Sequence, residues 1–294
     1  MSAFRVLSGV IALAVCILGV IVILTAHHAP VTIAQKIGDP SYIDPTTDGG
    51  DWDRLIGSTA GKVAIAVANV SNGPGDGPEP AWTSVIQREH ATGTKVLGYV
   101  DTGYFGTTGL RTRSGSTSEA DWTSQIEQDV NAWYAFYGPG IDGIFFDEGQ
   151  HACGPTSGSN AWVDLYGRIN AYAKTNRPGA MTAINPGKVV PRCYENTADV
   201  LVTFEGTYDS YVNHYAPLSW NPVDPLKIWH LIYDASTQAD MEKAVSLSQS
   251  RNAGYVYVTN DVLPNPYDTL PPSSYWAHEE GRVTPGGSRS STPP

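Results

Sequence analysis

Short, almost continuously apolar segments rich in β-branched residues recur along the chain, and longer amphipathic or loop-rich stretches separate them. Such segments are typical of parallel strands that are buried on both faces. Eight strands are predicted, at residues 32–37, 63–69, 95–101, 143–147, 180–185, 200–205, 227–233 and 254–259. Eight strands alternating with helices favour one closed (β/α)8 barrel, the TIM-barrel fold of the α/β class.

Three of the intervening stretches carry clear helical signals. After a capping-box pattern at 118–121, apolar residues recur at near-helical spacing and would face the core; they are Trp122, Ile126, Val130 and Trp133. A second helix around 162–172 ends before Pro178 and Gly179, and a third spans about 237–250. Each ends near Gly or Pro and leads into the next strand, as the barrel requires.

The first 30 residues form a separate element. Arg5 precedes an apolar run over 6–25 that is long enough to span a bilayer and longer than the usual core of a cleavable signal. An uncleaved anchor is favoured, although residues 24–26 also offer a cleavage site. Arg5 orients the remainder outside the cytoplasm. The protein is therefore expected to be extracellular or at the cell surface, either secreted or anchored through this helix.

The remaining chain divides into a barrel domain over 31–280 and a tail over 281–294, whose Pro, Ser and Gly content predicts no fixed structure. Outside the anchor only Cys153 and Cys193 remain. In an exported domain such a pair favours a disulfide, and two free thiols are the alternative. No zinc-ligand or calcium-loop spacing occurs, so neither a metal nor another cofactor is expected.

The charge narrows the choice of partners. With 18 Lys and Arg against 29 Asp and Glu, the formal net charge is -11. Nucleic-acid binding requires a basic face, so that class of function is disfavoured. Neutral or cationic partners are compatible with this balance.

Two predicted strands end in acids, namely Asp147 with Glu148 after the fourth strand and Glu205 after the sixth. Alternation along the fourth strand directs Asp147 into the barrel mouth together with Phe145. Glycosidic hydrolysis needs one acid that protonates the leaving oxygen and one carboxylate that attacks the anomeric carbon or activates water. We predict Asp147 as nucleophile and Glu205 as acid/base, with exchange of the Asp147 and Glu148 roles left open. A loop cap or solvated turn is the alternative for either acid alone.

Further polar and aromatic residues lie where strands end at the same rim, within reach of a sugar. For His230, which falls inside an apolar strand, a core histidine is the alternative. The candidate substrate-binding residues are Tyr42, Asn69, Asp101, Tyr104, Asn185, His230 and Asp261.

Five motifs, in this order and spacing, resemble the spherulin 4 proteins (spherulation-specific family 4); they are GYVDTGY (98–104), GIFFDE (143–148), NPG (185–187), TFE (203–205) and NPY (265–267). The resemblance implies a (β/α)8 glycoside hydrolase, whose relatives cleave α-1,4-linked N-acetylgalactosamine or galactosamine exopolysaccharide. The family's acidic positions fall on Asp147, Glu148 and Glu205. The chain departs from the family at Val70, where relatives tend to carry Pro, and in its first-strand aromatic segment over 40–45. We expect these departures to affect substrate preference more than catalytic activity.

Together these features predict an exported, endo-acting glycosidase for an amino-sugar exopolysaccharide, with a role in biofilm or cell-envelope turnover. The predicted partners are the polysaccharide and, if the first helix is retained, a membrane. Two alternatives remain, a carbohydrate-binding or cell-wall structural protein without turnover and a glycosidase for a different polysaccharide.

Overall fold

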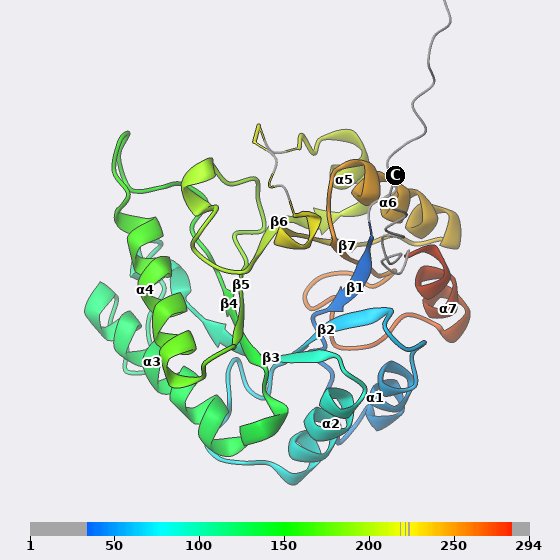
Figure 1. The fold of residues 1–294 in the computed structure, drawn as a ribbon, viewed down its shortest axis with the longest axis horizontal. Coiled ribbons are helices and arrows are strands. Elements are labelled where there is room, and N and C mark those ends of the chain that lie inside the picture. Colours follow the sequence, from blue (N-terminus) through cyan, green and yellow to red (C-terminus); the bar gives the residue numbers. More distant parts are fainter. Residues whose placement is uncertain (1–33, 218, 221, 223, 284–294) are drawn as a thin grey trace, which may run out of the picture. The chain divides into compact units, whose positions relative to one another are not determined.

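The computed structural model describes residues 34–217, 219–220, 222 and 224–283. In this part of the chain, parallel strands form a closed barrel in chain order, as predicted, and helices surround it (Figure 1). The strands are β1 (Lys36–Asp39), β2 (Val63–Ala68), β3 (Lys95–Asp101), β4 (Gly143–Asp147), β5 (Met181–Ile184), β6 (Val200–Thr207), β7 (Ile228–Tyr233) and β8 (Tyr255–Val258). The predicted anchor over 1–30 lies outside the described residues. Within them, no helix is long and apolar enough to cross a bilayer.

The helices follow the strands in the expected alternation. They are α1 (Gly49–Ile56), α2 (Pro80–Ala91), α3 (Glu119–Phe136), α4 (Ala161–Asn176), α5 (Tyr208–Asn213), α6 (Gln238–Ser250) and α7 (Ser273–Arg282), with short 3-10 helices η1 (Gly103–Gly106), η2 (Gly138–Gly140), η3 (Arg192–Tyr194) and η4 (Pro225–Lys227). The Ser118 hydroxyl caps α3 by accepting from the Asp121 N–H at 3.1 Å. A full capping box between Thr237 and Asp240 begins α6. Helix α7 ends two residues inside the predicted tail, because Tyr275, Trp276 and Glu279 are buried.

The first strand lies further along the chain than predicted. Apolar residues at 31–34 suggested a strand from 32, but β1 begins at Lys36. The Lys36 N–H donates to the Gly254 carbonyl and the Ile37 N–H to the Lys62 carbonyl, both at 2.9 Å. Pairing with β8 and β2 on both sides therefore sets the start of this strand, and local apolar content does not.

Aromatic side chains fill the barrel. The ring centroids of Tyr99 and Phe145 lie 6.3 Å apart, and those of Phe145 and Trp229 lie 5.6 Å apart. A Cβ atom at Gly38 would lie 2.8 Å from the Trp229 ring, so only glycine leaves room for this indole. The barrel interior is thus a packed core, and a ligand can enter only at its rim.

A β-bulge in β6 determines the direction of Glu205. Val202 is in register with Trp229, which faces the barrel interior, and the register then shifts before Phe204 pairs with His230. Both Thr203 and Phe204 contact His230 outside the barrel wall. Because two successive residues face outward, Glu205 turns inward. Strict alternation from Val202 would have directed it away from the barrel mouth.

The predicted disulfide is present. Cys153 in the β4–α4 loop is bonded to Cys193 in η3, with Cα atoms 6.0 Å apart. Beside it, the Tyr194 hydroxyl donates to the Gln150 carbonyl at 2.6 Å. The loops that follow β4 and β5 are therefore tied together on the side of the barrel where the strands end.

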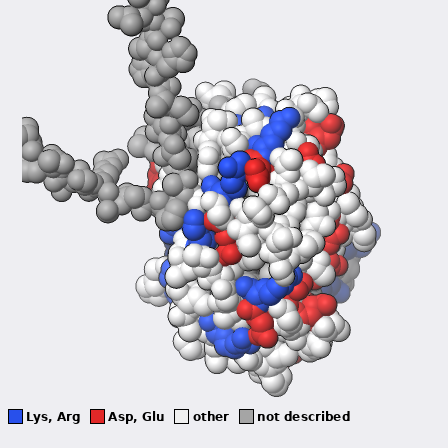
Figure 2. Space-filling view, turned by 90° about the vertical axis from the view of Figure 1, so that its right-hand side faces the viewer, with Lys and Arg blue, Asp and Glu red and all other residues white. Residues whose placement is uncertain are grey.

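Charged side chains of both signs are mixed over the face of the protein that Figure 2 presents. Lys and Arg side chains there lie next to Asp and Glu and form no continuous basic surface.

Candidate active site

A cleft of about 420 Å³ opens at the carboxyl ends of the barrel strands. The cleft is formed in part by the ends of strands β4, β5 and β6 and by the loop between β8 and α7. Its lining includes three acids, Asn185 and four tyrosines; these residues are Asp147, Glu148, Glu205, Asn185, Tyr42, Tyr104, Tyr233 and Tyr267. The three acids singled out by sequence therefore meet in one cleft.

Asn185 joins the acids of two strands. Its Nδ2 donates to Asp147 Oδ1 and to Glu205 Oε2, each at 2.7 Å. Its own Oδ1 accepts from the Gly187 N–H at 2.9 Å, which fixes the orientation of the amide. The two carboxylate oxygens can be no farther apart than the two bonds laid end to end, about 5.4 Å. Asp147 and Glu205 thus form a close pair held by one side chain.

Tyr267 is a site residue that sequence reasoning did not select. Its hydroxyl donates to Glu205 Oε1 at 2.9 Å, and its carbonyl accepts from the Tyr42 N–H at 3.1 Å. The ring also meets that of Tyr42 edge to face, with centroids 5.7 Å apart. The sequence signal for this residue was the NPY motif at 265–267. The motif contributed to the family resemblance, but no function was predicted for its tyrosine.

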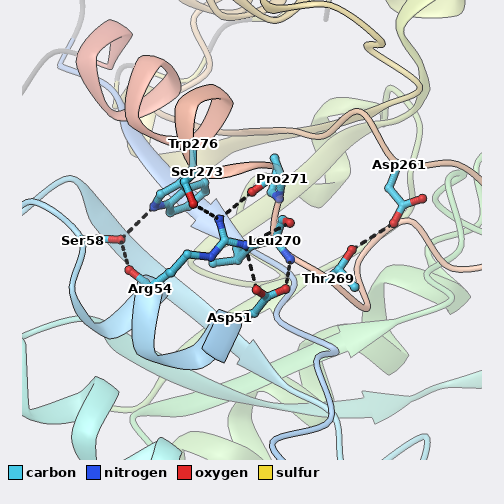
Figure 3. A network of polar contacts seen from close by, with 9 residues as sticks. All are labelled: Asp51, Arg54, Ser58, Asp261, Thr269, Leu270, Pro271, Ser273 and Trp276. Atoms are coloured by element: carbon cyan, nitrogen blue, oxygen red, sulfur yellow. Dashed lines mark hydrogen bonds and ion pairs between the residues drawn. The ribbon is translucent and has the colours of Figure 1, made fainter. Parts of the chain in front are cut away.

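Helix α1 anchors the far end of the loop that carries Tyr267 (Figure 3). Asp51 Oδ2 accepts from the Leu270 N–H at 2.9 Å, and Arg54 donates to the Pro271 carbonyl at 2.7 Å. Asp51 and Arg54 also bond each other at 2.8 Å. The segment just beyond Tyr267 is therefore fixed to an element that takes no part in the cleft.

The environment favours a proton on the Asp147–Glu205 pair. Burial, followed by the negative charge of Glu205, raises the pKa of Asp147 to about 7. Hydrogen bonds from Tyr99 and Asn185 act in the opposite direction but do not cancel this shift. A second negative charge beside Glu205 is costly for Asp147, so the environment favours keeping a proton on Asp147 up to about neutral pH.

Glu148 has a different environment from Asp147. Its backbone is left-handed, at φ 55°, and its carbonyl accepts from the Tyr104 N–H and the Thr102 hydroxyl. Burial and then the charge and hydrogen bonding of Asp101 raise the pKa of Glu148 to about 8. These effects favour the protonated form of Glu148 near neutral pH, with its hydrogen bond directed to Asp101.

The structure brings only part of the predicted substrate-binding set to the cleft. Tyr42, Tyr104 and Asn185 line it. Asp101 lies beside Glu148 in register with Asp147, and its Oδ1 accepts from the Gly103 N–H at 2.7 Å.

Asn69 and Asp261 instead organise loops. The Asn69 side chain accepts from the Gly73 N–H at 3.0 Å. The Asp261 carboxylate accepts from the Val262 N–H and from the Thr269 hydroxyl (Figure 3). Neither residue lines the cleft.

His230 lies outside the barrel wall. It is fully buried, and its ring nitrogens contact the hydroxyls of Tyr211 at 2.7 Å and Tyr215 at 3.0 Å. Burial, with a smaller effect of Arg251, lowers the pKa of His230 to about 3. Since side chains alternate along β7, a residue next to the inward-facing Trp229 must face the helices. The structure therefore gives His230 the position of a neutral core histidine.

Metal chemistry has no candidate residues in the described ranges. Among the described residues, there is no group of three or more His, Cys, Asp and Glu side chains that could hold a metal ion.

The sequence matches one known family over most of its length. A family model described as Spherulation-specific family 4 matches residues 36–280. Spherulin-4 of Physarum polycephalum is 27% identical over 201 residues, which cover 67% of this chain and 52% of that protein. The matched region thus spans about half the length of this relative.

Solved structures with a similar barrel include several carbohydrate-active proteins. Sph3 of Aspergillus clavatus, solved in complex with GalNAc, superposes with a TM-score of 0.67 at 21% identity and covers 84% of this chain and 97% of its own. A cyclic α-maltosyl-(1→6)-maltose hydrolase from Arthrobacter globiformis superposes with a TM-score of 0.50 at 10% identity. The match covers 85% of this chain and 82% of the hydrolase. At these identities the likeness establishes the shared fold.

Proposed function

Because the chain belongs to spherulation-specific family 4, we propose that it is a glycoside hydrolase acting on an amino-sugar exopolysaccharide. The observation that carries the proposal is the bridge from Asn185 Nδ2 to Asp147 and Glu205, which holds two carboxyl groups together in an open cleft. Hydrolysis of a glycosidic bond requires such a pair.

The separation of the pair favours retention of configuration. Retaining enzymes place their carboxyl groups about 5–5.5 Å apart, whereas inverting enzymes leave about 6.5–9.5 Å for a water molecule. The two oxygens that bond one Nδ2 at 2.7 Å lie at most about 5.4 Å apart, which fits the shorter range. The protein is therefore proposed to act through a covalent intermediate.

In the first step, after the proton has passed from Asp147 to Glu205, Asp147 attacks the anomeric carbon while Glu205 gives this proton to the glycosidic oxygen. The bond from the anomeric carbon to the leaving sugar breaks, and a glycosyl ester with Asp147 forms. In the second step, Glu205 takes a proton from water as the water oxygen attacks the same carbon. The ester bond breaks, and Asp147 returns as a carboxylate with Glu205 protonated.

The other cleft residues are proposed to hold the sugar. Glu148 is not bridged to the pair by Asn185, and a protonated Glu148 suits hydrogen bonding to the substrate better than attack on it. Tyr42 and Tyr104 offer ring faces and hydroxyls in the same cleft. This division of roles leaves Asp147, and not Glu148, as the nucleophile.

The substrate proposal is an α-1,4-linked polymer of N-acetylgalactosamine or galactosamine, cleaved internally. Its support is the family membership and the presence of GalNAc in the Sph3 structure. An open cleft also suits an internal position along a polymer. The disulfide between Cys153 and Cys193 supports export, since such bonds persist in oxidising compartments.

The test combines a polymer with an activated substrate. Asp147→Asn and Glu205→Gln should each abolish release of reducing ends from the polymer. On an aryl glycoside, whose leaving group needs no proton, Glu205→Gln should retain its glycosylation step and Asp147→Asn should not. Asp164→Asn, on the exposed side of α4, is the matched control.

NMR of the first product should give the α-anomer if configuration is retained. Binding of the polymer by wild type without release of reducing ends would instead indicate a carbohydrate-binding protein. Cleavage of another polymer in a panel would correct the substrate.

A further inference from the structure

A second hollow, of about 570 Å³, lies on the same side of the barrel as the active-site cleft. The β2–α2 loop, the β3–α3 loop and α3 form it, and loops after strands share the side on which the catalytic acids lie. The charged residues that line it are Asp76, Glu79, Arg113 and Asp129. None of them takes part in the proposed hydrolysis.

A fixed ion pair lies in this hollow. Arg113 donates to both oxygens of Asp129, at 2.9 and 2.5 Å, and Asp129 is only 3% exposed. The Arg113 N–H also donates to the Gln125 side chain at 2.7 Å. Although its guanidinium is bonded in this way, the Arg113 side chain remains 57% exposed. Its free N–H groups therefore have fixed positions, as recognition of sugar hydroxyls requires.

Gly73 leaves this pair uncovered. Its backbone, at φ 149°, lies in a region that favours glycine. A Cβ atom here would lie 3.7 Å from Asp129 Oδ2 and 4.0 Å from Arg113 Nη1. A larger side chain at this position would cover the ion pair, so the glycine keeps it accessible from the hollow.

The hollow and the catalytic cleft meet at Asp101. This residue is in register with Asp147 at the ends of β3 and β4. Its Oδ2 accepts from the Asn72 side chain at 3.3 Å, and Ser71, next to Asn72, lines the hollow. Asp101 therefore contacts both Glu148, which lines the cleft, and Asn72, whose neighbour Ser71 lines the hollow.

The hollow has an excess of negative charge. Asp129 neutralises Arg113, whereas Asp76 and Glu79 are exposed and form no ion pair within the described residues. A neutral sugar could offer these two carboxylates only hydrogen bonds from its hydroxyls. A sugar with a free amine, which is cationic at neutral pH, would be attracted to them.

We propose that this hollow is a distal subsite that binds a cationic amino-sugar unit of the same polymer whose bond is cleaved between Asp147 and Glu205. The inference rests on the proposed function and extends it. The acetylation pattern along the chain, in addition to the sugar at the cleft, then determines where cleavage occurs.

The test compares two substrates and one double variant, Asp76→Asn with Glu79→Gln. On a long, partly deacetylated polymer at low salt, the variant should raise KM about three- to tenfold, the effect expected from two exposed charge contacts. On a short, fully acetylated oligosaccharide, it should leave kcat and KM unchanged. Added salt should raise the wild-type KM on the polymer towards that of the variant. Asp53→Asn with Asp164→Asn removes two surface charges elsewhere and should match wild type.

Unchanged KM on the polymer at low salt would overturn the subsite, and so would an equal loss on the short substrate. If wild type cleaves neither substrate, the proposed function has failed and a binding titration still decides the subsite. In a calorimetric titration, the Asp147→Asn variant should then bind a galactosamine oligosaccharide. Adding Asp76→Asn and Glu79→Gln to this variant should weaken the binding. Equal affinity with and without them would refute the subsite.

Discussion

The hydroxyl of Tyr267 donates a hydrogen bond to Glu205 Oε1 at 2.9 Å, across 62 residues of sequence. A loop after the last strand thus contacts an acid at the end of the sixth. Glu205 receives one donor from this loop and one from Asn185, which directly follows β5, so its carboxyl group is held from two sides.

Tyr267→Phe should lower kcat/KM about 10- to 100-fold, because a hydrogen bond to a charged group contributes about 1.5–3 kcal/mol. The ring packing against Tyr42 remains, so the fold should persist. The comparison is Tyr275→Phe, which removes a bond from a buried tyrosine to the Ala235 carbonyl away from the cleft. If both variants lose activity equally, the Tyr267 hydroxyl has no special role.

Arg54→Ala should lower kcat/KM in the same direction, because it releases the Leu270 and Pro271 carbonyls that fix the Tyr267 loop to α1. In the Tyr267→Phe background it should have little further effect, since the contact it supports is already lost. Arg88→Ala, which removes an exposed pair with Asp53, is the control. Fully additive losses in kinetic assays of the double variant would contradict the link.

The pH profile of kcat/KM should fall on the alkaline side above about pH 7. The Asp147–Glu205 pair must carry one proton to protonate the leaving group, and the pKa of Asp147 is raised to about 7 by burial and by Glu205. Above that pH Asp147 is ionised, and this source of the proton is lost. Activity that continues to rise to pH 9, measured with a polymer of constant charge, would exclude this source of the proton.

Asp39→Asn should change how stability depends on pH. Burial chiefly raises the pKa of Asp39 to about 7, and its Oδ2 is buried without a hydrogen-bond partner. Because the folded pKa lies above the unfolded value, stability is greatest below about pH 4 and falls as pH rises to about 7.

The substitution removes this loss, which is on the order of 4 kcal/mol for a rise from 3.8 to about 7. Thermal unfolding between pH 4 and 8 should therefore show the variant gaining on wild type as pH rises. Parallel curves would mean that Asp39 does not titrate in this range, and Asp53→Asn, at an exposed position, should give such curves.

Local sequence determined most of the barrel. The strands β3 and β4 match their predicted bounds, because continuous apolar runs between helical segments can be buried only as interior parallel strands. Capping residues Ser118 and Thr237 fixed where α3 and α6 begin, since they satisfy N–H groups of their own helices. The disulfide was favoured by the sequence, because only two cysteines lie beyond residue 30 and the domain was predicted to be exported.

Contacts between distant segments decided the site. Sequence identified Asp147, Glu148 and Glu205 as acids at strand ends, but a bulge at Thr203 turned Glu205 inward, and Asn185 joined it to Asp147. Alternation along β7 directed His230 away from the cleft. The start of β1 depended on β2 and β8 in the same way. The sequence of a segment indicates whether it is buried and whether it has the periodicity of a strand. Register shifts and contacts between side chains of different strands depend on neighbouring segments, which only the closed barrel brings together.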